Sequence, residues 1–182
     1  MSARAELLEL LRDRSFARKR VVLASGKESD FFIDCKQTVL SAAGHRASGE
    51  VMLEAVVAMG PCDAVAGVEL GGCPLASAVS LTSCASGSPL DAIYVRKEAK
   101  DHGSKRQLEG DAHLRKAARV TLLEDVVTTG GSTLKAVEKL RAAGYDVAFV
   151  VALVDRQEGG REAIEAAGLV FTSIFTRADF MD

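Results

Sequence analysis

Apolar residues recur along this chain in two patterns, one typical of helices and the other of buried strands. Leucines within residues 3–14 fall at helical spacing, so that segment is predicted to form an amphipathic helix. Four more segments with a helical pattern follow, at residues 41–59, about 74–84, 132–143 and 160–167. Between them lie short, continuously apolar runs that predict strands, at residues 63–69, 90–96, 120–123, 147–154 and 169–175.

The alternation of apolar strands with helices indicates an α/β fold, with a mostly parallel central sheet covered by helices on both faces. Two short extended segments, 21–23 and 31–33, come first and are separated by a polar turn at 25–30. In such a sheet, ligands bind beyond the carboxyl ends of the strands. Chemistry is therefore expected in the loops that begin at Glu69, Arg96, Glu124 and Asp155.

Length, charge and cysteine content narrow the class of protein. With 182 residues the chain suits one domain, and 48% of hydrophobic residues is ordinary for a globular protein. A formal net charge of −2 gives no reason to expect nucleic acid as a partner. Charges interrupt the first helix and no apolar run is long enough to cross a membrane, so we expect no signal peptide and no membrane partner. The four cysteines form no CxxC pair and are expected to be reduced thiols of a cytoplasmic protein.

The most informative segment is residues 120–137, where an apolar strand is followed by two adjacent acids, Glu124 and Asp125. Five small residues then lead into a helix: Thr128, Thr129, Gly130, Gly131 and Ser132. Glycines let the backbone approach an anion, hydroxyls add donors, and the start of a helix supplies free N–H groups, so this loop suits a phosphate group. It lacks the GK[ST] ending of a Walker A loop.

The two acids would repel a bare phosphate, so the ligand must offer something else. A ribose 5-phosphate ester offers hydroxyls, a place for Mg²⁺ and a carbon that can become positive. The alternative is an ordinary strand-to-helix turn with solvated acids, in which Ser132 is only a helix cap. The segment resembles the phosphoribosyl pyrophosphate (PRPP) signature of type I phosphoribosyltransferases. The resemblance implies that residues 128–132 hold the 5-phosphate and that Glu124 and Asp125 bind the ribose hydroxyls, with Asp125 as a catalytic residue nearest the anomeric carbon.

A run of groups that carry, or can carry, a positive charge leaves the predicted strand at 90–96: Arg96, Lys97, Lys100 and His102. The alternative for such a run is a solvated loop. Residues 96–103, with Glu109 and Gly110, resemble the RKxxKxHG…EG loop of orotate phosphoribosyltransferases. The resemblance implies that these four cations bind PRPP and that the last three act in catalysis on the leaving pyrophosphate. It also implies a homodimer in which the loop 98–112 closes over the neighbouring subunit's site.

Two further segments resemble the base-binding parts of the same family. Residues 25–34 resemble its hood, where the SG turn and an aromatic pair contact the base, and an Asp-Arg pair at 155–156 matches one whose arginine faces the orotate carboxylate. A buried structural arginine is the alternative at that position. The residues that the resemblance assigns to orotate binding are Lys27, Phe31, Phe32, Thr128 and Arg156.

Residues 69–76 resemble the pyrophosphate-binding turn, with Gly71 and Gly72 as PRPP ligands. The match to the family runs from about residue 20 to 157, with the motifs in family order. Two departures occur, because some members carry lysines where this chain has Ala24 and Gly71. Other members lack both lysines, so the departures bear on detailed roles rather than on the activity.

The resemblance implies a type I phosphoribosyltransferase fold in a single domain, 1–182, with hood elements at about 15–40 and a core at about 41–182. The implied enzyme is a pentosyltransferase that moves the phosphoribosyl group of PRPP to orotate, giving orotidine 5-monophosphate and pyrophosphate in pyrimidine (UMP) biosynthesis. Mg²⁺ is the implied cofactor, carried mainly by PRPP, with Asp125 as a candidate contact and no other direct protein ligand. The alternatives are a purine or uracil phosphoribosyltransferase, which should not need the cationic loop or Arg156, and a regulatory PRPP-binding protein that also binds nucleic acid.

Overall fold

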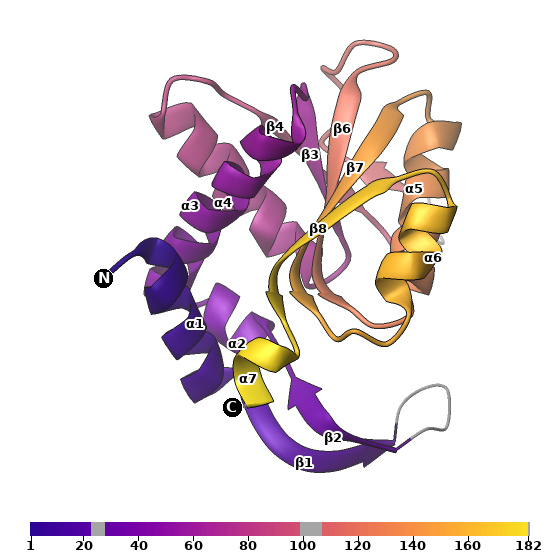
Figure 1. The fold of residues 1–182 in the computed structure, drawn as a ribbon. Helices are drawn as coiled ribbons and strands as arrows, with labels where there is room; N and C mark the ends of the chain where they lie inside the picture. The colour runs from indigo at the N-terminus through magenta and orange to yellow at the C-terminus, as the bar shows by residue number, and fades with distance from the viewer. Residues whose placement is uncertain (23–27, 99–106, 182) are drawn as a thin grey trace.

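The computed structural model of this protein describes residues 1–22, 28–98 and 107–181. Its central sheet has six strands in the order β5-β4-β3-β6-β7-β8 (Figure 1). They are β3 (Ala64–Val68), β4 (Asp91–Val95), β5 (Leu108–Glu109), β6 (Arg119–Val127), β7 (Asp146–Asp155) and β8 (Val170–Thr176). Neighbouring strands are parallel, except that β5 runs antiparallel to β4. The predicted α/β fold with a mostly parallel sheet is confirmed.

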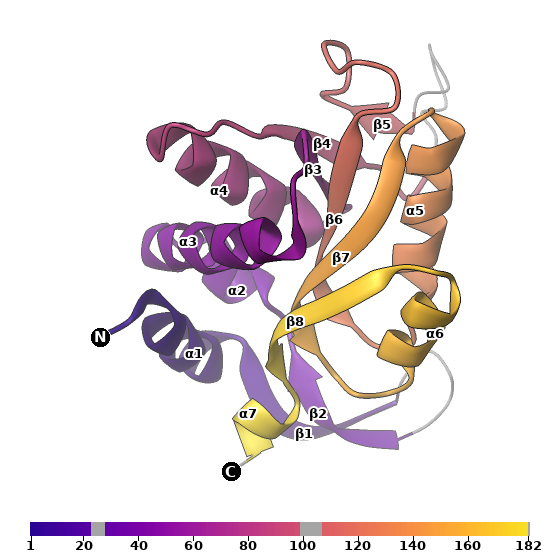
Figure 2. The same ribbon diagram turned by 45° about the horizontal axis from the view of Figure 1, so that its top comes forward.

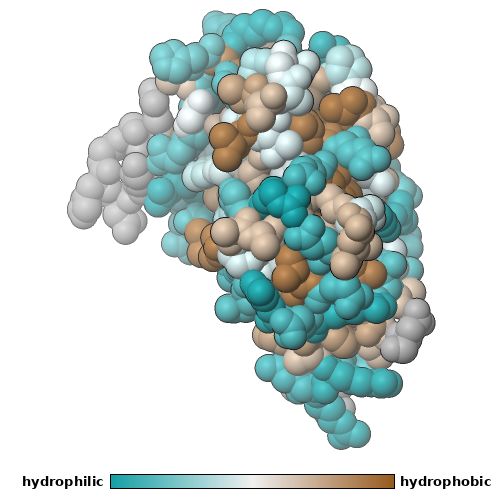
Figure 3. All heavy atoms as spheres, turned by 90° about the vertical axis from the view of Figure 1, so that its left-hand side faces the viewer, coloured by the Kyte–Doolittle hydropathy of each residue, from teal (hydrophilic) through white to brown (hydrophobic). Residues whose placement is uncertain are grey.

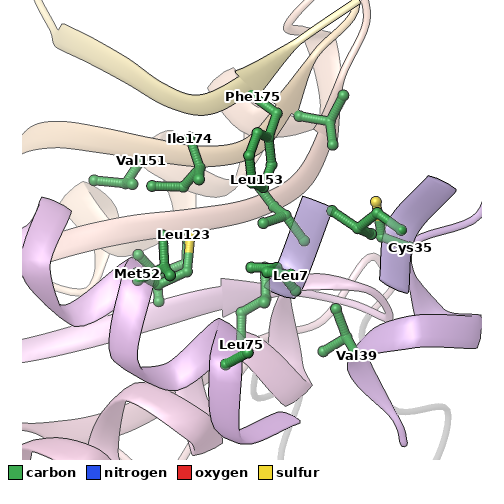
Figure 4. Packing of buried hydrophobic residues seen from close by; sticks show 14 of the residues in the cluster. Leu7, Cys35, Val39, Met52, Leu75, Leu123, Val151, Leu153, Ile174 and Phe175 are labelled. Carbon is green, nitrogen blue, oxygen red and sulfur yellow. The ribbon is translucent and has the colours of Figure 1, made fainter. Parts of the chain in front are cut away.

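Helices cover both faces of this sheet (Figure 2). On one face lie α3 (Ala42–Met59) and α4 (Gly72–Ala85), with α1 (Ala3–Arg14) packed against α3; on the other lie α5 (Gly131–Ala142) and α6 (Gly160–Ala166). Because side chains alternate along a strand, Leu123 of β6 enters the first core and Leu122 enters the second. Figure 4 shows the first core, to which Met52 of α3 and Leu75 of α4 also belong.

A separate antiparallel pair, β1 (Phe16–Val22) and β2 (Glu28–Ile33), lies beyond the carboxyl ends of the central strands (Figure 1). Two single-turn helices accompany it, α2 (Lys36–Val39) after β2 and α7 (Ala178–Met181) after β8. Phe16, Phe31 and Phe180 form an aromatic cluster with ring centroids 5.2–5.8 Å apart. This cluster joins the β1–β2 hairpin to the C-terminal helix. Aromatic pairs of this kind stabilise the junction by more than their burial alone would.

The structure differs from the sequence-based elements in the bounds of three strands, of which β2 begins at Glu28 rather than at residue 31. β1 begins at Phe16 rather than at residue 21. The sequence pattern missed its start because residues 18–20 are charged and exposed and interrupt the apolar run. β6 continues to Val127 instead of ending at residue 123, so the two acids belong to the strand and not to the loop after it. The short elements α2, α7 and β5 were not predicted, since a segment of two to four residues has no measurable hydrophobic period.

Two further observations concern the class of protein. All four cysteines lie in described segments and are free thiols, of which Cys35 and Cys73 are buried and Cys84 is exposed. Within the part of the chain that the structure describes, none of the helices has the length and apolar character of a membrane-spanning segment.

Candidate active site

The four loops expected to carry chemistry meet at one edge of the central sheet. The turn after β3 reaches the end of β4, because the Glu69 carboxylate accepts a hydrogen bond from the Lys97 main-chain N–H at 2.9 Å. Beyond β7, the Arg156 main-chain N–H donates to the Val127 carbonyl at the end of β6, also at 2.9 Å. The parallel register of the strands therefore gathers segments that are far apart in the sequence.

Gly71 and Asp125 are in contact across this edge. A Cβ atom built on Gly71 would lie 1.9 Å from Asp125 Oδ2, so any side chain at position 71 would displace that carboxylate. This contact gives a physical reason for one departure from the family pattern. In this chain the space beside the turn is taken by Asp125, and a lysine at position 71 would have to push it aside.

The two acids of β6 point to opposite faces of the sheet, as neighbouring residues of a strand must. Glu124 is 4% exposed and faces α5, where its Oε2 accepts hydrogen bonds from Thr133 Oγ1 at 3.1 Å and Ser132 Oγ at 3.4 Å. Asp125 faces Gly71 and the first turn of α2. The two carboxyls remain close enough for each to influence the pKa of the other, so they act as a pair whose further neighbours differ.

Burial changes the protonation of both acids. Removal from water, and then the charge of Asp125, raise the pKa of Glu124 to about 8. Burial also raises the pKa of Asp125, although the positive charge of Lys36 works against this. One carboxyl of the pair therefore holds a proton at pH 7. Buried carboxyls with such shifted pKa values are more common at functional sites than elsewhere.

The segment 128–132, predicted to bind the 5-phosphate and called the phosphate loop below, forms the turn that leads into α5. Gly130 is the helix N-cap, with a φ of 79° that favours glycine, and the helix begins at Gly131. A Cβ on Gly130 would lie 3.1 Å from the Gly160 carbonyl, so the loop also packs against the first turn of α6. Thr129, Gly131 and Ser132 are exposed, and the first N–H groups of a helix have no partner within it. The loop can therefore donate several hydrogen bonds to one anion.

Only part of the predicted cationic segment can be placed. Arg96 lies at the end of β4, with its NH1 3.5 Å from Glu109 Oε1, and Lys97 is exposed beside it. Both line a cavity of about 280 Å³ that also includes Ser132 of the phosphate loop. The predicted catalytic residues Lys100 and His102 lie outside the described residues, as do the rest of 99–106.

The aromatic pair of β2 does not share one environment. Phe31 is 0% exposed and its ring belongs to the aromatic cluster with Phe16 and Phe180. Phe32, on the opposite face of the strand, is half-buried and lies under Lys19, whose Nζ is 3.9 Å from the ring centroid. Strand alternation thus sends the two rings to opposite faces, with Phe31 in the core, and contact of both rings with the base stays a prediction. Lys27 lies outside the described residues.

Arg156 connects the end of β7 to β2. Its side chain is 11% exposed, its NH2 group donates to the Phe31 carbonyl at 3.1 Å, and the same group lies 2.9 Å from Glu158 Oε1. The guanidinium also lies over the Phe31 ring, 5.5 Å from the centroid. Arg156 thus stands where the hairpin meets the sheet, and these contacts fit both a base-binding arginine and a structural one.

Two lysines at this edge were not predicted from the sequence as site residues. Lys36, in α2, has its Nζ 2.5 Å from Asp34 Oδ1 and is close enough to Asp125 to influence its pKa. Lys139, in α5, donates to the carbonyls of Arg96 and Lys97. Lys36 follows a strand with no motif around it. Lys139 falls in a helical pattern, where lysines are usually solvated, so no sequence signal distinguished either of them.

Comparison with known proteins points to one family. The model of the phosphoribosyl transferase domain family matches residues 45–177. The chain is 67% identical over 180 residues to the orotate phosphoribosyltransferase of Sorangium cellulosum, covering 99% of this chain and 94% of that protein. It also superimposes on the crystal structure of Mycobacterium tuberculosis orotate phosphoribosyltransferase in complex with Fe(III) dicitrate, with a TM-score of 0.83, 39% identity and 99% of both chains covered. The same mycobacterial enzyme in complex with PRPP gives a TM-score of 0.80 at 36% identity, with 98% of both chains covered.

Proposed function

The chain belongs to the orotate phosphoribosyltransferases of the phosphoribosyl transferase family, and on that premise we propose that it transfers the phosphoribosyl group of PRPP to orotate, releasing pyrophosphate. The observation that carries the proposal is the meeting of Asp125, Gly71 and the phosphate loop at one edge of the sheet. A phosphate loop next to a buried carboxylate suits a phosphorylated sugar whose anomeric carbon becomes positive. It does not suit a simple phosphate.

PRPP binding is assigned to three neighbouring loops. The N–H groups and hydroxyls of residues 128–132 bind the 5-phosphate, and Gly71 and Gly72 allow the pyrophosphate to approach the turn after β3. Asp125 accepts from a ribose hydroxyl on one side of β6, and Glu124 supports the ribose site from the other side. The cations proposed to neutralise the leaving pyrophosphate are Arg96, Lys97, Lys100 and His102.

The chemistry assigned to these residues is electrostatic. Bond breaking at the anomeric carbon runs ahead of attack by the orotate nitrogen, so positive charge grows on the ribose and negative charge on the leaving group. Asp125 stabilises the positive charge on the ribose, and the cations stabilise the negative charge on the pyrophosphate. Both are in position before the reaction starts. The raised pKa of Glu124 fits a ligand rich in negative charge, because a carboxyl that keeps its proton does not repel the phosphate groups.

Orotate binding is assigned to the junction of the hairpin and β7. Arg156 offers a planar, two-pronged donor that matches a carboxylate. Thr128 lies at the end of the neighbouring strand, and Lys27, Phe32 and the main chain of Phe31 complete the proposed pocket. Residues 15–40 act in this proposal as a hood over the base.

Mg²⁺ is the proposed cofactor. Among the described residues no group of three or more His, Cys, Asp or Glu side chains is arranged to hold a metal ion. In this proposal the ion arrives on the substrate, because Mg²⁺ keeps several waters and is often bound by substrate phosphates with one or two carboxylates. Asp125 is the carboxylate placed to contact it. When bound, the ion neutralises charge on the pyrophosphate.

A homodimer is the proposed assembly, with the α3–α4 surface as its interface. This surface carries exposed apolar side chains, among them Leu40 (64% exposed) and Leu81 (69% exposed), around a hollow of about 600 Å³. Figure 3 shows apolar patches on this side of the molecule. Leu70, 62% exposed, stands in the turn that leads into α4, so apolar surface also borders the active-site edge. In the proposed dimer a second copy covers these side chains, and the loop 98–112 serves the partner's site.

The proposed function is tested by incubating the protein with PRPP, Mg²⁺ and single bases. We expect the absorbance of orotate to fall, with release of pyrophosphate, and no comparable reaction with uracil, adenine or guanine. Omission of Mg²⁺, or its removal by a chelator, should abolish the reaction. Transfer to a purine or to uracil in preference to orotate would refute the assignment of the base.

A further inference from the structure

Lys139 lies in the last turn of α5, and its side chain leaves its own helix to reach the end of β4. Its ammonium donates to the Arg96 carbonyl at 2.7 Å and to the Lys97 carbonyl at 2.8 Å. A lysine near a helix C-terminus ordinarily interacts with the helix dipole and with water. Two short bonds to consecutive carbonyls of another element indicate a more specific role.

The direction of these two carbonyls shows that Lys139 holds the main chain just after the end of β4. Along a strand, successive carbonyls point in opposite directions, so one ammonium cannot donate to both. Arg96 and Lys97 follow the last residue of β4, and Arg96 still donates its N–H to the Gln107 carbonyl at 2.9 Å. Lys139 therefore bonds to the main chain where β4 ends. Its two hydrogen bonds fix the direction in which the chain leaves the strand.

The same two residues are held from the opposite side. The Lys97 N–H donates to Glu69 Oε2 at 2.9 Å, in the turn expected to hold pyrophosphate. The peptide group between Arg96 and Lys97 is thus bonded at both ends, by its N–H to the turn after β3 and by its C=O to α5, and the carbonyl of Lys97 is bonded to α5 as well. Because α5 begins at the phosphate loop, Lys139 joins the helix that starts at the 5-phosphate site to the backbone of the cations assigned to pyrophosphate.

We propose that Lys139 is a positioning residue for the pyrophosphate end of PRPP, acting through the main chain of Arg96 and Lys97. This inference rests on the proposed function, since it takes those two cations as pyrophosphate ligands. Lys139 does not contact the substrate in this scheme. It sets the distance between the site of the 5-phosphate and that of the pyrophosphate, and an error of about 1 Å in such positioning can cost on the order of 100-fold in rate.

The test compares Lys139→Met with Lys135→Met. Lys135 is exposed, lies one turn earlier on the same helix and lines the same cavity as Lys139, so both variants lose one positive charge beside that cavity, whereas only Lys139 bonds to the two carbonyls. We expect Lys139→Met to weaken the binding of inorganic pyrophosphate and to lower kcat/KM for PRPP by on the order of 10- to 100-fold. Binding of ribose 5-phosphate, which in this scheme uses the loop at 128–132 and the acids of β6 but neither Arg96 nor Lys97, should stay within about twofold of the unchanged protein. Lys139→Arg, which keeps donors for both carbonyls, should retain most of the pyrophosphate affinity.

Two outcomes would overturn the inference. Equal losses in Lys135→Met and Lys139→Met would show that charge alone matters, and parallel losses for pyrophosphate and ribose 5-phosphate would show a general disturbance of α5. The amide resonance of Lys97 provides a readout independent of activity, since it should move in Lys139→Met and not in Lys135→Met. If the unchanged protein failed to bind pyrophosphate, the proposed function would fall, while that resonance would still decide whether Lys139 sets the turn.

Discussion

The chemistry proposed at the residue scale depends on how much water each carboxylate retains. Glu124 is almost fully buried and receives hydrogen bonds from two hydroxyls of α5, whereas Asp125 lies against a glycine turn with Lys36 nearby. The two side chains differ by one methylene and are adjacent in the sequence, yet their different surroundings suit them to different roles. Glu124 is suited to hold a proton in the absence of ligand, and Asp125 to face the reacting carbon.

Asp125→Asn should lower kcat much more than it weakens PRPP binding. An interaction that strengthens as positive charge develops contributes to the transition state rather than to the ground state. Loss of one such group typically costs on the order of 10²–10³ in rate. Steady-state kinetics with orotate, together with calorimetric PRPP binding, measure the two effects. Near-normal turnover in this variant would remove Asp125 from its assigned role.

Glu124→Gln should make the ligand-free fold more stable at alkaline pH. The folded carboxyl, with its pKa near 8, keeps a proton that the unfolded chain releases above about pH 4.5, so this group makes the fold less stable as pH rises between those values. A neutral amide removes that loss. The Tm of the variant should therefore exceed that of the unchanged protein by more at pH 8 than at pH 5, at roughly 2–4 °C for each kcal/mol.

The matched control for this experiment is Glu138→Gln, at an exposed position of α5. It removes one carboxylate from the neighbouring helix without changing a buried group, so its Tm difference should be small and similar at both pH values. An equal difference for Glu124→Gln at pH 5 and pH 8 would contradict the raised pKa.

Between elements, the decisive junction is the one that joins the β1–β2 hairpin to the central sheet. Two arginines make it from different strands: Arg156, after β7, donates to the Phe31 carbonyl, and Arg177, after β8, forms an ion pair with Asp30. Both guanidinium groups lie over the Phe31 ring, at 5.5 and 5.7 Å from its centroid. The junction can therefore serve as an anchor, as a base site, or as both.

Arg156→Ala should raise the KM for orotate while sparing PRPP binding, because a site that pairs a carboxylate loses affinity when its donor is removed. Arg177→Ala is the control, since it also loosens the hairpin but lies outside the proposed orotate contacts. If the two variants changed the KM for orotate equally, Arg156 would act as an anchor for β2 and not as a base ligand.

At the scale of the whole molecule, the proposed site is complete only in a dimer. Loop 98–112 supplies two of the assigned cations, Lys100 and His102, and in the proposed assembly it serves the partner's ribose site. The exposed leucines of the α3–α4 surface give that assembly a physical driving force, because contact between two copies removes them from water. Closed two-fold symmetry then repeats the exchange at both sites.

Mixing two inactive variants tests this arrangement. Lys100→Ala damages the loop and Asp125→Asn damages the ribose site, so a mixed dimer keeps one intact site if the loop crosses the interface. Random exchange makes about half the dimers mixed, and roughly a quarter of full activity should return. Adding Leu81→Glu to both variants should prevent the recovery by breaking the interface. No recovery despite proven subunit exchange would place the loop in its own subunit's site.

The sequence by itself determined the order of the longer helices and strands, the mostly parallel sheet and the motifs of the site, because hydrophobic period and loop composition are local properties of the chain. It predicted the contents of the loops at Glu69, Arg96, Glu124 and Asp155, and the structure brings these loops together. Phe31 and Phe32 show the limit, since a local pattern placed both at the base although one ring lies in the core.

Only the tertiary structure decided which groups are buried and which partners they have. Glu124 is buried because α5 packs over it. Asp125 can take its position because Gly71 has no side chain, and Lys139 finds its hydrogen-bond partners only where β4 ends. Each of these contacts joins segments that are distant in the sequence. Desolvation and hydrogen bonding are set by neighbours in space, so the pKa values and the positioning residues of the site could not be read from the order of its amino acids.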